Sequence, residues 1–258
     1  MNWNHKELDA FYSHEFDFKN QYKTSYDDWI KTFDATVRKV GCNGCFMGLS
    51  SGYDSGAISK ALSKWYKFKA FTMYNNENKD IISARLKYVP EYEIANMTVD
   101  QWKGYYNFLL GKITEQNQRD MASMGVAYTF DTANKQGYKV FICGQGGDEI
   151  ISDYALYPNQ SEFKGKFPAD LYEWPNFRGH MNLEYITEIE DIAKIYGIET
   201  HYPFLDVALV QEFLWLTSEL KNAAYKAPIK EYLVRNSVLY EENKKRGFNP
   251  IPKEQAIP

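Results

Sequence analysis

Between Ser25 and Cys143, the apolar positions of the chain alternate between two patterns. Apolar side chains that recur every three or four residues predict an amphipathic helix, whereas a short unbroken apolar run predicts a buried strand. Helices are predicted from Ser25 onward (with Tyr26, Ile30, Phe33 and Val37 on one side), after SSGYDSG (with Ile58, Leu62 and Trp65 on one side), over Asp80–Tyr88 and within Val99–Gly137. Strands are predicted over Cys45–Leu49, Phe68–Tyr74, Tyr92–Met97 and Lys139–Cys143.

This alternation of strands and helices determines the expected fold class. Neighbouring parallel strands need long crossover connections, and helices supply them. We therefore expect an α/β fold in which a parallel sheet carries helices on both faces. Beyond the fourth strand the pattern becomes mainly helical, with predicted helices over Leu183–Tyr196, Asp206–Leu216 and Ala227–Tyr240.

The remaining segments suggest how the chain is divided. Residues 157–180 are rich in Pro, Gly, Asn and Tyr, which indicates a long excursion, and three prolines in residues 247–258 indicate an extended tail. We expect three regions: an N-terminal extension (1–24), an α/β nucleotide-binding core (25–156) and a mainly helical C-terminal part (157–258).

Composition narrows the class of protein. Of 258 residues, 44% are hydrophobic and 25% charged, the balance of a chain that folds around a core. No apolar run approaches the roughly 20 residues of a membrane-spanning helix, and mean hydropathy is −0.55, so a membrane protein is excluded. The start shows no secretory signal, and three cysteines are too few for a disulfide framework, so we expect a cytoplasmic protein. A net charge of −4 with dispersed basic residues argues against a nucleic-acid partner.

Two loops at predicted strand ends carry residues suited to chemistry. The first is Leu49-Ser50-Ser51-Gly52-Tyr53-Asp54-Ser55-Gly56, in which small residues open a helix. Backbone N–H groups can approach a phosphate there, and serine hydroxyls can donate to it. Asp54 is out of place beside an anion unless it holds a cation, and Mg²⁺ bound to phosphate oxygens meets that need.

The second loop is Gly144-Gln145-Gly146-Gly147-Asp148-Glu149, which again follows a predicted strand. Ligands of open parallel sheets bind at the carboxyl ends of the strands, where the strand order reverses. The two loops together predict a nucleotide–Mg²⁺ site in which Asp54 and Asp148 flank one ion. The motifs of Walker-type ATPases and of dinucleotide oxidoreductases are absent from the sequence.

The chain also resembles a known family at five places in the family's order. LSSGYDSG resembles the SGGxDS loop of ATP pyrophosphatases, and GQGGDEIISDY resembles a segment particular to asparagine synthetases. The other three are GIETHYPFLD at 197–206, KAPIK at 226–230 and KRGFNP at 245–250, which resemble that family's G-x-E-x-R-x-P-F-L-D, K-x-x-[IL]-R and K-x-G-F.

The resemblance implies a HUP-like, PP-loop ATP pyrophosphatase fold and an ATP-dependent, AMP-forming ligase that uses Mg²⁺. It assigns the pyrophosphate to Ser50, Ser51, Gly52 and Ser55, the Mg²⁺ ion to Asp54 and Asp148, the phosphates during adenylation to Lys226 and Lys245, and the adenosine to Leu49, Met73 and the Cys143–Gly144 backbone.

Four positions depart from the family's pattern. Ser51 replaces a glycine, His201 and Asp191 stand where arginines occur, and Gln145 replaces a glutamate expected near the reacting carbonyl. Because glutamine cannot take a proton at neutral pH, help with the amine step is expected from Glu190 or Glu149. Aspartate and ammonia are therefore the less favoured substrate pair.

These features predict an ATP-dependent amide ligase that adenylates a small-molecule carboxylate and transfers it to ammonia or an amine. Asn2 follows Met1 where the family's glutaminase nucleophile is a cysteine, so ammonia is expected to arrive free or from a separate amidotransferase. One rival is a degenerate PP-loop protein that binds ATP without ligating. A third reading, a thiolating or lysidine-forming enzyme acting on tRNA, predicts a basic surface that the composition does not offer.

Overall fold

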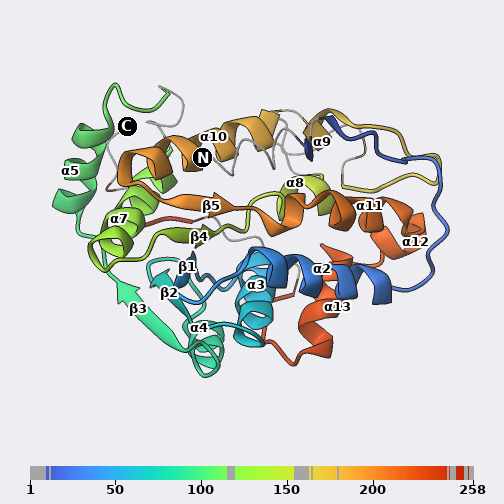
Figure 1. Ribbon diagram of the computed structural model, residues 1–258, viewed down its shortest axis with the longest axis horizontal. Helices are drawn as coiled ribbons and strands as arrows, with labels where there is room; N and C mark the ends of the chain where they lie inside the picture. Colours follow the sequence, from blue (N-terminus) through green and yellow to red (C-terminus); the bar gives the residue numbers. More distant parts are fainter. Residues whose placement is uncertain are drawn as a thin grey trace.

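A five-stranded parallel sheet forms the centre of the molecule (Figure 1). The computed structural model describes residues 10–11, 13–114, 120–153, 163, 165–178, 180–242, 244, 248–252 and 255, with the backbone alone at 175–176 and 180–185. The strand order is β3-β2-β1-β4-β5, and every pairing is parallel. The strands are β1 (Cys45–Gly48), β2 (Phe68–Met73), β3 (Glu91–Ala95), β4 (Val140–Ile142) and β5 (Glu199–His201).

Helices cover both faces of this sheet, which confirms the predicted fold class. In Figure 1, α2, α3, α4 and α13 lie on one side of the sheet, and α7 and α10 lie on the other. The helices of the α/β part are α2 (Asp27–Val40), α3 (Tyr53–Ser63), α4 (Lys79–Leu86), α5 (Val99–Leu109), α7 (Met121–Lys135) and α8 (Gly147–Ile151). The later part contains α9 (Pro175–Arg178), α10 (His180–Tyr196), the 3₁₀ helix η1 (Pro203–Leu205), α11 (Val207–Trp215), α12 (Ser218–Lys221) and α13 (Ala227–Arg235).

Local capping determines where several helices begin. The Asn78 side chain accepts from Asp80 N and Ile81 N at the start of α4, and Thr98 and Gln101 form a capping box at the start of α5. One detail of the sequence prediction is wrong. The helix α3 ends at Ser63, so Trp65 lies beyond it, 47% exposed and stacked on Arg38.

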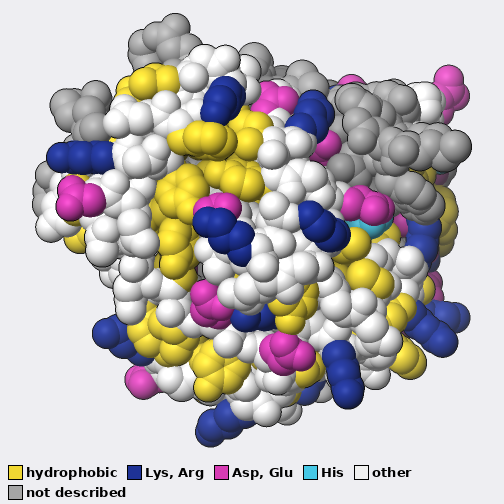
Figure 2. All heavy atoms as spheres, turned by 60° about the vertical axis from the view of Figure 1, so that its left-hand side comes forward, with side chains coloured by type: hydrophobic (Ala, Val, Ile, Leu, Met, Phe, Trp, Pro, Cys, Tyr) yellow, Lys and Arg dark blue, Asp and Glu magenta, His cyan; other side chains and the backbone are white. Residues whose placement is uncertain are grey.

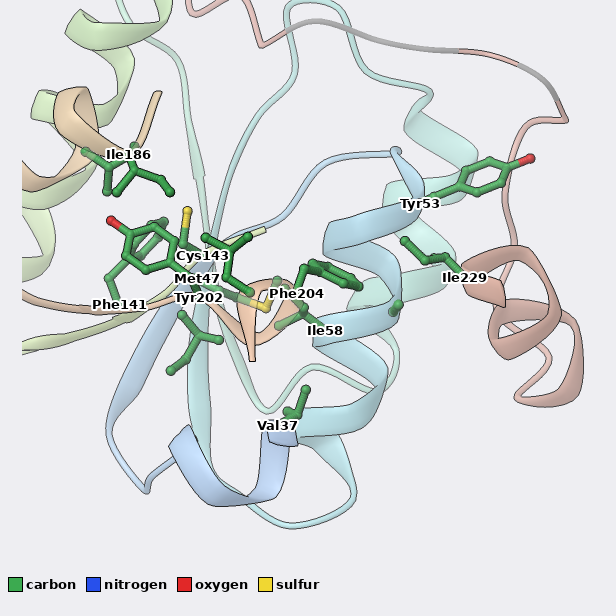
Figure 3. Close-up of a cluster of buried hydrophobic side chains, with 14 of the residues drawn as sticks. Val37, Met47, Tyr53, Ile58, Phe141, Cys143, Ile186, Tyr202, Phe204 and Ile229 are labelled. Atoms are coloured by element: carbon green, nitrogen blue, oxygen red, sulfur yellow. The ribbon is translucent and has the colours of Figure 1, made fainter. Parts of the chain in front are cut away.

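Apolar side chains from both halves of the sequence meet beneath the strand ends. Figure 3 shows Met47 of β1, Ile58 of α3 and Phe204 of η1 close together, with Ile229 of α13 on the other side of α3, nearer Tyr53. All four are buried, and full burial of such a side chain contributes about 2 kcal/mol. The C-terminal part therefore completes the same core rather than forming one of its own.

The segment before α2 is held against the C-terminal helices. Lys23 pairs with Leu216 in a parallel bridge, and Lys221 Nζ donates to Gln21 Oε1 at 2.7 Å. Within the described residues, no helix is both long and apolar enough to cross a membrane. On the face in Figure 2, the coloured lysine and arginine side chains are interspersed with acidic and apolar ones.

Candidate functional site

The two predicted loops meet where the strand order reverses. β1 is hydrogen-bonded to β2 on one side and to β4 on the other, so the loops that leave β1 and β4 lie together at the carboxyl edge of the sheet. Their contact is close. A Cβ atom on Gly147 would lie 2.7 Å from Asp54 Oδ1, so glycine is required if Asp54 is to keep its place.

Serine hydroxyls shape the first loop. Ser55 Oγ accepts from Ser50 N at 3.0 Å and lies 2.8 Å from Ser50 Oγ, and Ser50 Oγ accepts from Gly52 N at 3.2 Å. These bonds close the loop between β1 and the first turn of α3. Because Asp54 lies in that turn, the same geometry fixes its position.

A buried arginine stabilises the backbone of the first loop through hydrogen bonds. Arg85 of α4 is fully buried, and its Nη1 donates to Ser50 O at 2.5 Å and to Gly52 O at 2.7 Å. Its Nη2 donates to Leu239 O at 2.9 Å, which ties the loop to the segment after α13. Burial lowers the pKa of Arg85 to about 10, so the guanidinium remains charged at neutral pH. Sequence reasoning missed this residue, because a lone arginine in a helix carries no motif.

A lysine from the far end of the chain lies between the two aspartates. Lys226 Nζ is 2.5 Å from Asp54 Oδ2 and 2.8 Å from Asp148 Oδ1. Burial alone would lower the pKa of Lys226, but the charges of Asp148 and Asp54 outweigh burial and raise it. Tyr225 donates its hydroxyl to Asp148 Oδ1 at 3.1 Å. The two carboxylates predicted to flank one cation thus flank the ammonium of this chain.

The backbone at Lys226 is adapted to this position. Its φ of 48° and ψ of 49° are in the left-handed region, which non-glycine residues seldom occupy. Lys226 is also the N-cap of α13, whose first turn contains Pro228. The turn aims the lysine side chain at the strand ends, and backbone strain of this kind concentrates at functional sites.

A cavity of about 240 Å³ opens beside this triad. Asp54, Asp148 and Lys226 lie together in its lining with Ser50 nearby in the first loop, and we call this group the polar end. The remaining lining is largely apolar, with the rings of Phe130 and Phe141 packed at 4.9 Å between centroids, and we call it the apolar end. The sequence-predicted residues that line it are Leu49, Ser50, Gly52, Asp54, Ser55, Met73, Cys143, Gly144, Gln145, Asp148 and Lys226. The lining residues that sequence reasoning missed include Tyr53, Phe71, Val126, Thr129, Phe130, Phe141, Tyr225, Lys244 and Phe248.

Two predicted residues lie outside the cavity lining, and the placement of a third is not described. Ser51 is buried outside the cavity lining, and both its N–H and its hydroxyl donate to Glu77 Oε2, so this carboxylate engages both donors that the sequence assigns to the pyrophosphate. Glu190 also lies outside the lining and accepts from Thr200 and from the Tyr202 hydroxyl. Lys245 falls outside the described residues.

Glu149, a candidate base, and two of the positions that depart from the family's pattern also have structural partners. Glu149 Oε2 accepts from Gly146 N at 2.9 Å and so caps α8. His201 is buried on β5 with Nε2 3.0 Å from Glu199 Oε1, whereas Asp191 pairs with Lys194 on the surface of α10. Of the substituted positions, Gln145 is the one that lines the cavity.

The site fits a divalent ion by the chemistry of its donors. Mg²⁺ is bound in proteins through one or two carboxylates together with substrate phosphate oxygens. Asp54 and Asp148 present oxygens to one point, as their shared contact with Lys226 Nζ shows. In the described part of the chain, no cluster of three or more metal-ligating side chains is found, so the remaining ligands would come from the nucleotide and water.

Comparison with known proteins identifies the family of the chain. A family model described as asparagine synthase matches residues 43–188, which is more than half of the chain. The chain therefore belongs to the asparagine synthase family. The matched range contains both loops and ends before Lys226.

The individual proteins that the chain matches have low sequence identity to it. The chain is 25% identical over 192 residues to a Methanocaldococcus jannaschii protein provisionally named asparagine synthetase (glutamine-hydrolyzing) 1. The alignment covers 68% of this chain and 34% of that protein, so the chain spans about a third of the relative's length. The solved structure of NMN synthetase from Francisella tularensis aligns with 88% of this chain and 100% of its own, at 14% identity and a TM-score of 0.35.

Proposed function

We propose that the chain is an ATP-dependent, AMP-forming ligase that activates a carboxylate as its acyl-adenylate and joins it to ammonia or an amine. The observation that carries this proposal is the charged triad of Asp54, Asp148 and Lys226 at one end of an apolar cavity. This arrangement suits a molecule with a flat apolar end and a highly charged end, which describes ATP.

The first step needs charge to be stabilised on a leaving pyrophosphate. A substrate carboxylate oxygen attacks the α-phosphorus, the bond from that phosphorus to the α–β bridging oxygen breaks, and its electron pair leaves with pyrophosphate. Ser50 and Ser55 line the cavity where their hydroxyls can donate to pyrophosphate, and Lys226 supplies positive charge. Asp54 and Asp148 would hold Mg²⁺, which supplies further charge neutralisation on the phosphates when bound.

The second step needs an amine or ammonia nitrogen that is not protonated as an ammonium, because only its free lone pair can attack. An amine attacks the acyl carbon, the bond from that carbon to the adenylate oxygen breaks, and AMP leaves. Gln145 lines the cavity and can orient a reactant through its amide, but it cannot accept the proton. Glu190 accepts hydrogen bonds from Thr200 and Tyr202 and does not line the cavity. We therefore propose that the proton leaves through solvent or through the amine substrate itself.

The test is pyrophosphate release with a panel of small carboxylates, each with and without ammonia or an amine. The proposal expects release with at least one carboxylate and AMP as the second nucleotide product. Because Gln145 cannot accept a proton, it favours one alternative function, in which the protein binds ATP but forms no amide bond. ATP binding by calorimetry, with no pyrophosphate from any pairing, would establish that alternative.

A further inference from the structure

The ammonium of Lys226 takes the place that a divalent ion is expected to fill. We propose that, without nucleotide, Lys226 acts as an internal stand-in for the metal and that a divalent ion enters only together with the nucleotide phosphates. This inference rests on the proposed function, because it concerns the same nucleotide site, and it adds an order in which the ligands bind.

Distances and burial support the competition. Lys226 Nζ contacts both Asp54 and Asp148 within 2.8 Å, and Lys226 is only 3% exposed. A divalent ion on the same two carboxylates at about 2.1 Å would be within a few ångström of the ammonium. Like charges at that distance in a buried site repel strongly, so one cation must leave when the other arrives.

The nucleotide offers the ammonium a second position. Lys226, Ser50, Gly52 and Ser55 line the same cavity, so a triphosphate bound along the first loop would lie within reach of the lysine. The backbone of Lys226 begins α13, and Lys230 N donates to Lys226 O at 2.9 Å. The flexible side chain can therefore turn from the aspartates to the phosphates while the helix stays in place.

The charge balance also favours a coupled exchange. Two carboxylates and one ammonium give the triad a net charge of −1 in the nucleotide-free protein. Adding a divalent ion alone would reverse the sign of a buried site, whereas adding it with a polyanionic triphosphate keeps the positive and negative charges paired. Nucleotide and metal are thus expected to bind as one unit.

The experiment is Mn²⁺ binding by electron paramagnetic resonance, which reports the free ion directly. Without nucleotide, wild-type protein is expected to bind Mn²⁺ at least 30-fold more weakly than the Lys226→Met variant. Lys230→Met, which removes an ammonium paired with Glu242 one turn farther along α13, is the matched control and is expected to bind like wild type. A double variant, Lys226→Met with Asp148→Asn, is expected to lose the gained affinity.

A second measurement covers the case in which Lys226→Met does not fold. In wild-type protein, an ATP analogue with a non-hydrolysable α–β linkage is expected to raise Mn²⁺ affinity at least 30-fold. Tight Mn²⁺ binding to wild type without nucleotide, or equally weak binding to wild type and Lys226→Met, would overturn the inference. A protein that shows the expected Mn²⁺ behaviour but releases no pyrophosphate would retain the inference and lose the proposed ligase activity.

Discussion

The two ends of the cavity are built in different ways. The polar end joins three charged groups from segments far apart in the sequence, Asp54, Asp148 and Lys226. The apolar end is lined by side chains such as Phe71, Phe130 and Phe141, which also pack in the main core. The arrangement of the polar end depends on a few short ionic contacts, whereas the arrangement of the apolar end depends on the packing of the whole sheet.

Because of this difference, we expect substitutions at the two ends to have effects of different size. At the polar end each charged group supplies a ligand or a charge that no neighbour replaces, so single substitutions are expected to have large effects on activity. At the apolar end the neighbours of any one side chain share its packing, so a partly exposed residue can be lost at small cost. The following predictions test this contrast, from the largest expected effect to the smallest.

Asp148→Asn is expected to have the largest effect. Lys226 would still be paired with Asp54, so the fold should persist, but one of the two carboxylates for the ion would be lost. With a carboxylate that supports turnover, pyrophosphate release is expected to fall about 1,000-fold. Asp191→Asn, at an ion pair on the surface of α10, should leave the rate unchanged. A loss of less than tenfold in Asp148→Asn would contradict the role given to this carboxylate.

Arg85→Met is expected to destabilise the protein by about 3 kcal/mol, because three backbone carbonyl groups lose the donor that a fully buried guanidinium supplies. Urea unfolding measures this change. Since the first loop would also relax, ATP affinity should fall in parallel. Arg85→Lys keeps the charge but loses the planar set of N–H donors of the guanidinium, so an intermediate loss of stability is expected. Lys87→Met, at an exposed position, should leave the stability unchanged.

Gly147→Ala is expected to weaken Mg²⁺–ATP binding about 30-fold, equivalent to about 2 kcal/mol. The added methyl group would displace Asp54, whose Oδ1 would lie only 2.7 Å away, and it would also approach Phe204 at 3.3 Å. Calorimetric titration gives the affinity. The control is Gly104→Ala in α5, where an added Cβ meets nothing within 4 Å. Unchanged affinity in Gly147→Ala would mean that the two loops separate when nucleotide binds.

Phe248→Ala is expected to have the smallest effect. Its ring lies over Gly125 at the apolar end and is 38% exposed. ATP affinity is expected to fall about tenfold, while the affinity for inorganic triphosphate, which fills only the polar end, stays the same. Phe108→Ala, a similarly exposed phenylalanine in α5, serves as the control. Equal losses for ATP and triphosphate would show that the two ends are not independent.

The sequence predicted the charged residues of the site better than their arrangement. Asp54, Asp148 and Lys226 stand in motifs, and the alternation of strands and helices correctly placed both loops at strand ends. The contact of Lys226 with both aspartates was not predictable, because spacing along the chain says nothing about the distance between segments that only folding brings together. Ser51 shows the same limit, since its motif position pointed to phosphate whereas Glu77, 26 residues later, takes its donors.

The parts of the fold that sequence reasoning missed are those without a local signal. β5 has only three residues, Glu199–His201, and forms because β4 offers an open edge. The apolar cavity lining has the same composition as the core, so no pattern distinguishes Phe130 as a wall of the site. The observed ends of the helices also differ from the predicted ones, because capping and packing determine where a helix stops.

The pairing of residues near the two ends of the chain has a consequence for synthesis on the ribosome. Tyr22 and Lys23 donate backbone hydrogen bonds to Trp215 O, and Thr217 N donates to Lys23 O. These partners are separated by nearly 200 residues, so the first cannot be secured until the second has been translated. The segment before α2 therefore cannot make these contacts until residues 215–217 have left the ribosome.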